Sequence, residues 1–222
     1  QEWKEKRNSI CRYMITNMPI SDIDVQDVKA FIRQCRKDGK KPNTIRNLYN
    51  GISRIYTYGN SEWDLKLINP ISQLDNTSKP KKSKPRDRRL EDGEYEMLVE
   101  EAHRSVEKRQ GGPDSEPWLP YLIRFLTHSG LRLGETRRIE SDENQIAKRL
   151  VYLHETKNDN DRIVPLPKGA YDALMDFKDH WGKETIFNLN EKALSGTFHR
   201  FKKRLLKEGK IKKNLTLHDL RH

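Results

Sequence analysis

The chain has 222 residues, a length that suits one or two domains, each with a buried core. Charged residues make up 35% of it and hydrophobic residues 33%, so we expect small cores beneath an extensively charged surface. The sequence has no apolar run of membrane-spanning length, no apolar stretch near Gln1 of the kind that directs secretion, and only two cysteines, so it predicts a soluble, cytoplasmic protein without a disulfide framework.

The net charge is +11, from 44 Lys and Arg against 33 Asp and Glu. A basic excess of this size favours a polyanionic partner, with nucleic acid ahead of an anionic membrane surface. Charge alone leaves a third interpretation open, a basic protein without a polyanionic partner.

Residues 1–74 are predicted to form a small helical bundle, because they show helical spacing and no strand-like alternation. One helix is expected after the cap-forming residues 21–27, and another after Pro42 with Asn43 or Thr44 as its N-cap. The apolar positions expected to face the core are Val28, Phe31, Ile32, Cys35, Ile45, Leu48, Ile52 and Ile55.

The polar face of the second helix carries Thr44, Arg46 and Asn47, whose side chains suit contacts with DNA phosphates and base edges. We predict these three residues to bind DNA. A solvated outer face is the alternative interpretation of the same pattern.

Residues 75–89 contain two prolines, seven basic residues and no aliphatic residue, which predicts an exposed linker between two domains. We expect its cations, among them Lys81, Lys82, Lys84 and Arg86, to lie along a DNA backbone as a basic strap. The alternative is a solvated hinge that its charges merely keep extended.

Residues 90–222 are predicted to form a second, mainly helical domain. Helices are expected over 91–108, 118–127, 133–139, 168–181 and 191–207, and a hairpin of two short strands over 150–153 and 162–165. The cations Arg200, Lys203, Arg204 and Lys207 are expected to point outward, where they either line a DNA channel or form a solvated face. The predicted fold class is therefore mainly α with a small antiparallel sheet (α+β).

Three separated segments carry side chains that suit chemistry on a phosphate: HSGLRLGET around Arg132, ETKNDNDRIVPLP around Lys157, and TLHDLRH at the end of the sequence. Each alone has a common structural explanation, namely a surface arginine, a hairpin lysine or a structural histidine. Together, two guanidiniums offer planar forks to a tetrahedral phosphate, and a lysine and a histidine can transfer protons around it. The combination indicates phosphoryl transfer.

These segments resemble the motifs of tyrosine recombinases, the integrase family of site-specific DNA recombinases. The pattern T-G-L-R-x-x-E is matched by residues 129–135 with Ser129 in the first place, T-K-x(4)-R-x-V-P-L by residues 156–166, and H-x-L-R-H by residues 218–222. The resemblance implies a helical, SAM-like core-binding domain at 1–74, a basic linker at 75–89 and a catalytic domain at 90–222.

The resemblance also implies catalytic roles for four residues. Arg132 and Arg221 would bind the non-bridging oxygens of the scissile phosphate and offset the charge of the transition state. Lys157 would protonate the departing 5′ oxygen, and His218 would bond the phosphate and assist proton transfer.

Three further residues are implied to support the site. Glu135 would orient an arginine, with a simple salt bridge on the helix surface as the alternative. His222 would pack near the site, and Arg162 would contact DNA. We expect no metal, because the His218 and His222 pair lacks a third ligand nearby, and no cofactor.

The family's nucleophilic tyrosine follows the H-x-L-R-H motif, whereas all eight tyrosines here, from Tyr13 to Tyr171, precede it. We therefore expect a fragment that binds duplex DNA without cleaving it, and a tyrosine of a longer parent chain that forms a 3′-phosphotyrosyl link. The family implies a homotetramer on two DNA sites for the full-length, nucleoid-associated protein, while the fragment can stay monomeric. A type IB topoisomerase, an inactive DNA-binding regulator or excision factor, and an RNA-binding protein remain alternatives.

Overall fold

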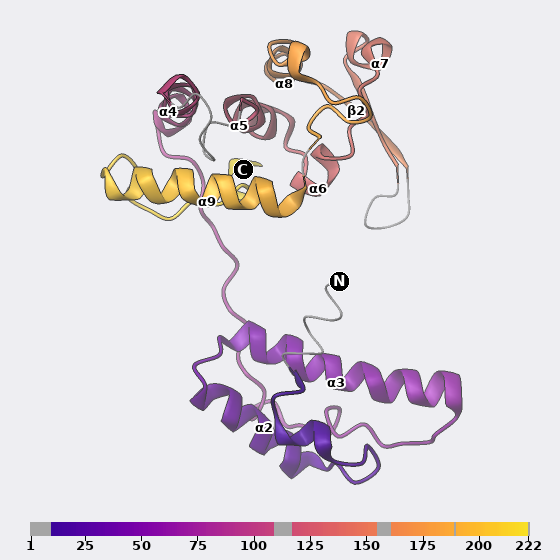
Figure 1. The fold of residues 1–222 in the computed structure, drawn as a ribbon. Coiled ribbons are helices and arrows are strands. Elements are labelled where there is room, and N and C mark those ends of the chain that lie inside the picture. Colours follow the sequence, from indigo (N-terminus) through magenta and orange to yellow (C-terminus); the bar gives the residue numbers. More distant parts are fainter. Residues whose placement is uncertain (1–9, 109–116, 155–160, 189, 222) are drawn as a thin grey trace. The chain divides into compact units, whose positions relative to one another are not determined.

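The computed structural model describes residues 10–108, 117–154, 161–188 and 190–221 (Figure 1). Contacts between Cα atoms divide the chain into two compact units, Gln1–Arg86 and Asp87–His222, called unit 1 and unit 2 below. Each unit has its own hydrophobic core. None of the helices in the described part of the chain combines the length and the apolar character needed to cross a membrane.

Unit 1 consists of the 3₁₀ turn η1 (Met14–Asn17), α2 (Val25–Lys37) and the long helix α3 (Pro42–Trp63). A capping box starts α2, in which Asp24 Oδ1 accepts hydrogen bonds from the backbone N–H groups of Gln26 and Asp27. The Asp27 carboxylate in turn accepts from the backbone N–H of Asp24. The cap-forming residues that the sequence places before this helix therefore do start it.

Most predicted core positions of unit 1 are buried, but the prediction for Ile55 is wrong. Ile55 is 44% exposed, and Tyr56 is buried in its place. A stripe that begins at Ile45 completes three turns of 3.6 residues near position 56, so position 55 points away from the core.

The predicted N-cap of α3 is also wrong. Neither Asn43 nor Thr44 caps the helix, because Pro42 occupies its first position and Lys41 precedes it. Proline suits this position, since the N–H that it lacks would have no partner within the helix.

The predicted linker is partly bound to unit 1. Arg46 Nη1 donates to the carbonyl oxygen of Pro80 at 3.1 Å, and the backbone N–H of Ser83 donates to Asn43 Oδ1 at 3.0 Å. Residues 84–87 beyond these contacts are exposed. The first part of the basic strap thus has a defined course along α3.

Unit 2 is mainly helical. Its elements in chain order are α4 (Glu94–Lys108), α5 (Leu119–Ser129), α6 (Leu133–Thr136), α7 (Glu143–Ala147), β1 (Leu150–Leu153), β2 (Arg162–Pro165), α8 (Lys168–Met175), η2 (Lys178–His180), α9 (Glu191–Lys207) and η3 (Asp219–Arg221). The strands β1 and β2 pair antiparallel, with Leu150 opposite Pro165 and Leu153 opposite Arg162. The predicted fold class, mainly α with a small antiparallel sheet, is confirmed.

The core of unit 2 centres on α5, which packs against α4 and α8 (Figure 1). The helix predicted over 133–139 is shorter than expected and stops at Thr136. The backbone beyond it pairs elsewhere, because Ile139 O accepts from the N–H of Ile186 at 3.0 Å and Glu140 forms a bridge with Thr185.

Candidate active site

The loop after α5 brings Arg132 and Glu135 together. Gly130 ends α5 in the left-handed region, at φ 64°, and lets the chain turn toward the buried Leu131. Glu135, on α6, accepts at Oε2 from the backbone N–H of Arg132 (2.8 Å) and at Oε1 from Arg132 Nη1 (2.9 Å). One carboxylate thus fixes both the backbone and the side chain of Arg132.

Strand β2 places a second arginine on the same carboxylate. Arg162 Nη2 donates to Glu135 Oε1 at 3.0 Å. The side chain of Glu135 is 5% exposed, whereas those of Arg132 and Arg162 are 54% and 44% exposed. The carboxylate is therefore enclosed, while both guanidiniums keep donors accessible to a ligand.

A third arginine, Arg221, comes from η3. Its Nε donates to the carbonyl oxygen of Gly130 at 2.7 Å. The turn before it is shaped by the buried Asp219, whose Oδ2 accepts from the backbone N–H (2.7 Å) and the hydroxyl (2.8 Å) of Thr216. Arg221 is thereby held beside the loop that carries Arg132.

The charges of this arginine cluster act on one another. Burial lowers the pKa of Arg221, and the positive charges of Arg132 and Arg162 lower it further while Glu135 opposes them. Burial raises the pKa of Glu135, but its hydrogen bonds with Arg132 and the nearby guanidiniums outweigh burial, so the pKa lies below its ordinary value. The three arginines and Glu135 together carry a net charge of about +2. This positive charge suits binding of a tetrahedral oxyanion such as phosphate.

The structure thus brings together Arg132, Glu135, Arg162 and Arg221. Arg162 was predicted from the sequence to contact DNA, and its hydrogen bond with Glu135 was not predicted. The only signal was its place in the same motif as Lys157, since no spacing along the chain reveals a contact between a strand and a distant helix.

His218 lies one 3₁₀ turn before Arg221, and its carbonyl oxygen accepts from the Arg221 N–H at 3.3 Å. His218 is exposed. Lys157 and His222 lie outside the described residues. Within the described part of the chain, no group of three or more His, Cys, Asp or Glu is placed to hold a metal ion.

The other residues predicted to bind DNA lie outside the arginine cluster. Arg46 is half-buried against Pro80, and the others are exposed: Thr44, Asn47, Lys81, Lys82, Lys84, Arg86, Arg200 and Lys203. The prediction that Arg204 points outward is wrong, because its guanidinium turns toward α4 and donates to Glu101 Oε2 at 3.0 Å. A buried carboxylate on the neighbouring helix outweighs solvation of this cation.

Comparison with known proteins relates the chain to recombinases. A model of the phage integrase family matches residues 88–222. The chain is 27% identical over 224 residues to a putative integrase/recombinase of Haemophilus influenzae, a match that covers 98% of this chain and 59% of that protein. It is 24% identical to the tyrosine recombinase XerD of Listeria innocua, over 95% of this chain and 71% of that protein. The chain spans less than two thirds of the length of the two Haemophilus relatives that it matches.

Solved structures share the fold. The integrase of the Tn1549 transposon, in complex with circular intermediate DNA, matches with a TM-score of 0.68 and 15% identity over 98% of this chain and 76% of that one. A lambda integrase tetramer bound to a Holliday junction matches with a TM-score of 0.71 and 19% identity, over 99% and 63% of the two chains. At such low sequence identities the structural similarity shows the fold of the chain. Its activity has to be argued from the residues of the site.

Proposed function

We propose, since the chain belongs to the phage integrase family of tyrosine recombinases, that it forms the DNA-binding and phosphate-binding part of a site-specific recombinase. Such an enzyme breaks and rejoins duplex DNA. The observation that carries the proposal is the cluster of Arg132, Arg162 and Arg221 around the buried Glu135. Two accessible guanidiniums held by one enclosed carboxylate, with a third guanidinium held by Gly130 O, form an anion site that needs little reorganisation when a phosphate binds.

In this proposal Arg132 and Arg221 bind the non-bridging oxygens of the scissile phosphate. Negative charge on these oxygens grows as the phosphorus becomes pentacoordinate, so fixed guanidiniums stabilise the transition state more than the ground state. Glu135 orients Arg132 and Arg162, and the hydrogen bond from Arg221 Nε to Gly130 O holds Arg221.

The chemical step exchanges one phosphate ester for another. A tyrosine oxygen bonds to phosphorus while the bond from phosphorus to the 5′ oxygen breaks, which gives a 3′-phosphotyrosyl link and a free 5′ hydroxyl. The tyrosine proton leaves with the help of His218, and Lys157 donates a proton to the departing oxygen. The reverse exchange rejoins a strand without an external energy source, because the ester bond is conserved.

We further propose unit 1 as the core-binding part and unit 2 as the catalytic part, with duplex DNA as their shared partner. The exposed cations of the basic strap and of α9 would neutralise backbone phosphates, and Thr44 and Asn47, which are exposed on α3, would contact DNA. The full-length protein would act as a tetramer on two DNA sites.

The decisive experiment uses a chain that continues past His222 and carries the family's tyrosine. It is incubated in EDTA with a nicked duplex that contains its attachment site, and the products are separated on a denaturing gel. The nicked duplex loses its short strand on cleavage and so traps the covalent intermediate. We expect a protein-DNA adduct that disappears in Arg132→Ala and Arg221→Ala.

Lys183→Ala is the matched control, because it removes one exposed positive charge of unit 2 outside the arginine cluster. It should leave adduct formation unchanged. Tight binding to the attachment site without any adduct would overturn the catalytic proposal and leave a DNA-binding regulator of the same fold.

A further inference from the structure

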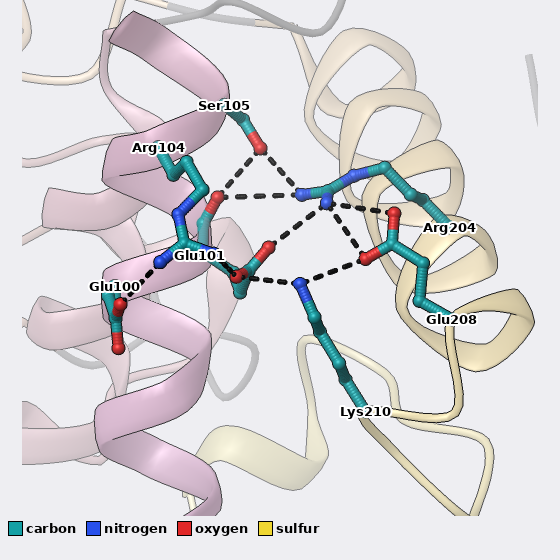
Figure 2. A network of polar contacts seen from close by, with 7 residues as sticks. All are labelled: Glu100, Glu101, Arg104, Ser105, Arg204, Glu208 and Lys210. Carbon is teal, nitrogen blue, oxygen red and sulfur yellow. Dashed lines mark hydrogen bonds and ion pairs between the residues drawn. The ribbon is translucent and has the colours of Figure 1, made fainter. Parts of the chain in front are cut away.

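A second charged cluster lies in unit 2, between α4 and the C-terminal end of α9 (Figure 2). At its centre is Glu101, a residue only 3% exposed. Its carboxylate accepts from Arg104 Nη1 at 2.7 Å, from Arg204 Nη1 at 3.0 Å and from Lys210 Nζ at 2.8 Å. Three cations thus neutralise one buried carboxylate, which would be costly to leave without a partner.

Further contacts complete this Glu101 network. Glu208 contacts Arg204 at 3.3 Å and Lys210 at 3.0 Å. Arg204 Nη2 also donates to Ser105 Oγ at 2.7 Å, and that hydroxyl donates to the carbonyl oxygen of Glu101 at 2.7 Å. Figure 2 shows the guanidinium of Arg204 and the ammonium of Lys210 pointing toward the same carboxylate, both from the side of α9 and the segment that follows it.

The two cations belong to different parts of the chain. Arg204 lies in the last turn of α9, whereas Lys210 follows Gly209, which leaves the helix in the left-handed region at φ 71°. The Arg204 contacts therefore hold α9 on α4. The Lys210 contact holds the start of the segment that follows, residues 211–221.

This segment carries two residues of the proposed active site, His218 and Arg221. It contains little regular structure besides η3, and apolar side chains such as Leu215 and Leu220 bury it in the core. Its far end is fixed by the hydrogen bond from Arg221 Nε to Gly130 O. The segment is thus anchored by a polar contact at each end, Lys210 to Glu101 and Arg221 to Gly130.

We propose that Lys210 and Glu101 are positioning residues, which fix the start of residues 211–221 and thereby the placement of Arg221 and His218 toward a bound phosphate. This inference rests on the proposed function, since it assumes that Arg221 binds phosphate. Neither residue touches the arginine cluster itself in the contacts described above. The ammonium of Lys210 acts only through the segment that it anchors.

Lys210→Met separates this role from general stability. It keeps the aliphatic stem and removes the contacts of the ammonium with Glu101 and Glu208. Arg104 and Arg204 still neutralise Glu101, so no buried charge is left alone. The packing of α9 on α4 should persist for the same reason. Glu208→Gln, which neutralises the other carboxylate that pairs with Lys210, provides a second and milder variant.

The test uses the 222-residue chain and inorganic phosphate as the probe, with the dissociation constant measured by titration calorimetry well below the unfolding temperature. We expect Lys210→Met to weaken phosphate binding by about fivefold. It should also speed amide hydrogen exchange within residues 211–221. Lys210→Arg should restore both values, and Glu208→Gln should shift both in the same direction by less.

Lys212→Met is the matched control, because it removes an exposed charge from the same segment without touching the Glu101 network. Lys212→Met should leave amide hydrogen exchange within residues 211–221 unchanged. It also measures how much the loss of one charge alone weakens phosphate binding. If Lys210→Met lowers the melting temperature but binds phosphate no worse than Lys212→Met, the network is only structural and the inference is wrong. If Arg221→Ala also leaves phosphate binding unchanged, the proposed phosphate site itself fails.

Discussion

Arg132 and Arg162 donate to the same oxygen, Glu135 Oε1, at 2.9 and 3.0 Å. Arg132 belongs to the loop after α5 and Arg162 to β2, so one buried side chain ties the hairpin to that loop. The other oxygen, Oε2, is occupied by the backbone N–H of Arg132. The placement of both guanidiniums therefore depends on a single ionised group.

Glu135→Gln should destabilise unit 2 by about 2 kcal/mol, because a neutral amide cannot balance two guanidiniums. The pKa of Glu135 is lowered in the folded chain, so its contribution is present above the ordinary carboxyl pKa and is lost as pH falls through the lower folded value. Thermal unfolding of both proteins at neutral pH and in acid should therefore show the difference in stability shrinking in acid. If wild type and Glu135→Gln differed in stability by the same amount at both pH values, the charge of the Glu135 carboxylate would not be the cause of the difference.

DNA binding by the 222-residue chain should weaken steeply with salt, with a log-log slope of roughly −0.9 for each phosphate neutralised. Replacing Lys81, Lys82 and Lys84 by Ala should make the slope shallower, by up to about 0.9 for each lysine that contacts a phosphate. Fluorescence anisotropy of a labelled duplex at several salt concentrations measures the slope. Replacing Lys168, Lys178 and Lys183 is the control of equal charge, and an equal change in both triple variants would contradict a specific role for the strap.

Part of the site can be predicted from the sequence because it depends on local spacing. Arg132 and Glu135 are three residues apart, so a helix start brings them together. The contact between Arg162 and Glu135 depends on how the hairpin packs against the loop, which no local pattern encodes. The wrong prediction for Arg204 has the same cause. Its position on α9 predicts exposure, and only the packing of α4 against α9 brings Glu101 to it.

The fold shows the same division. The apolar period located α2 and α3, and the turn-forming residues between two short apolar runs located the hairpin. The early end of α6 was not predictable, because it follows from a long-range pairing of Ile139 with Ile186. The sequence likewise predicted an exposed linker, whereas Arg46 and Asn43 hold its first part by contacts with backbone groups.

Limited digestion with trypsin tests that attachment of the strap. The N–H of Ser83 donates to Asn43 and should slow cleavage of the bond after Lys82, whereas Arg86 lies beyond this contact in the sequence. Asn43→Ala should therefore speed cleavage after Lys82 several-fold and leave cleavage after Arg86 unchanged. Mass spectrometry of the early fragments measures both rates in one sample, so the second site is an internal control. Equal acceleration at both sites would indicate general loosening of unit 1 instead.

Arg162 provides the sharpest test of the arginine cluster, because charge and geometry can be separated there. Arg162→Ala should weaken binding of inorganic phosphate to the 222-residue chain by about tenfold, the usual cost of losing a hydrogen bond to a charged group. Arg162→Lys keeps the positive charge and can still pair with Glu135, but an ammonium lacks the planar fork that serves a carboxylate and a phosphate at once.

Arg162→Lys should therefore bind phosphate with an affinity between those of the wild type and Arg162→Ala, measured by titration calorimetry. Full recovery in the lysine variant would mean that only the field of a third cation matters at this position. No loss in Arg162→Ala would mean that Arg162 serves the hairpin rather than the phosphate, and the loss should then appear as a lower unfolding temperature. The intermediate affinity is expected because Arg162 uses only Nη2 on Glu135 and keeps other N–H donors of its planar fork for a ligand, whereas a lysine that pairs with Glu135 retains the charge without that fork.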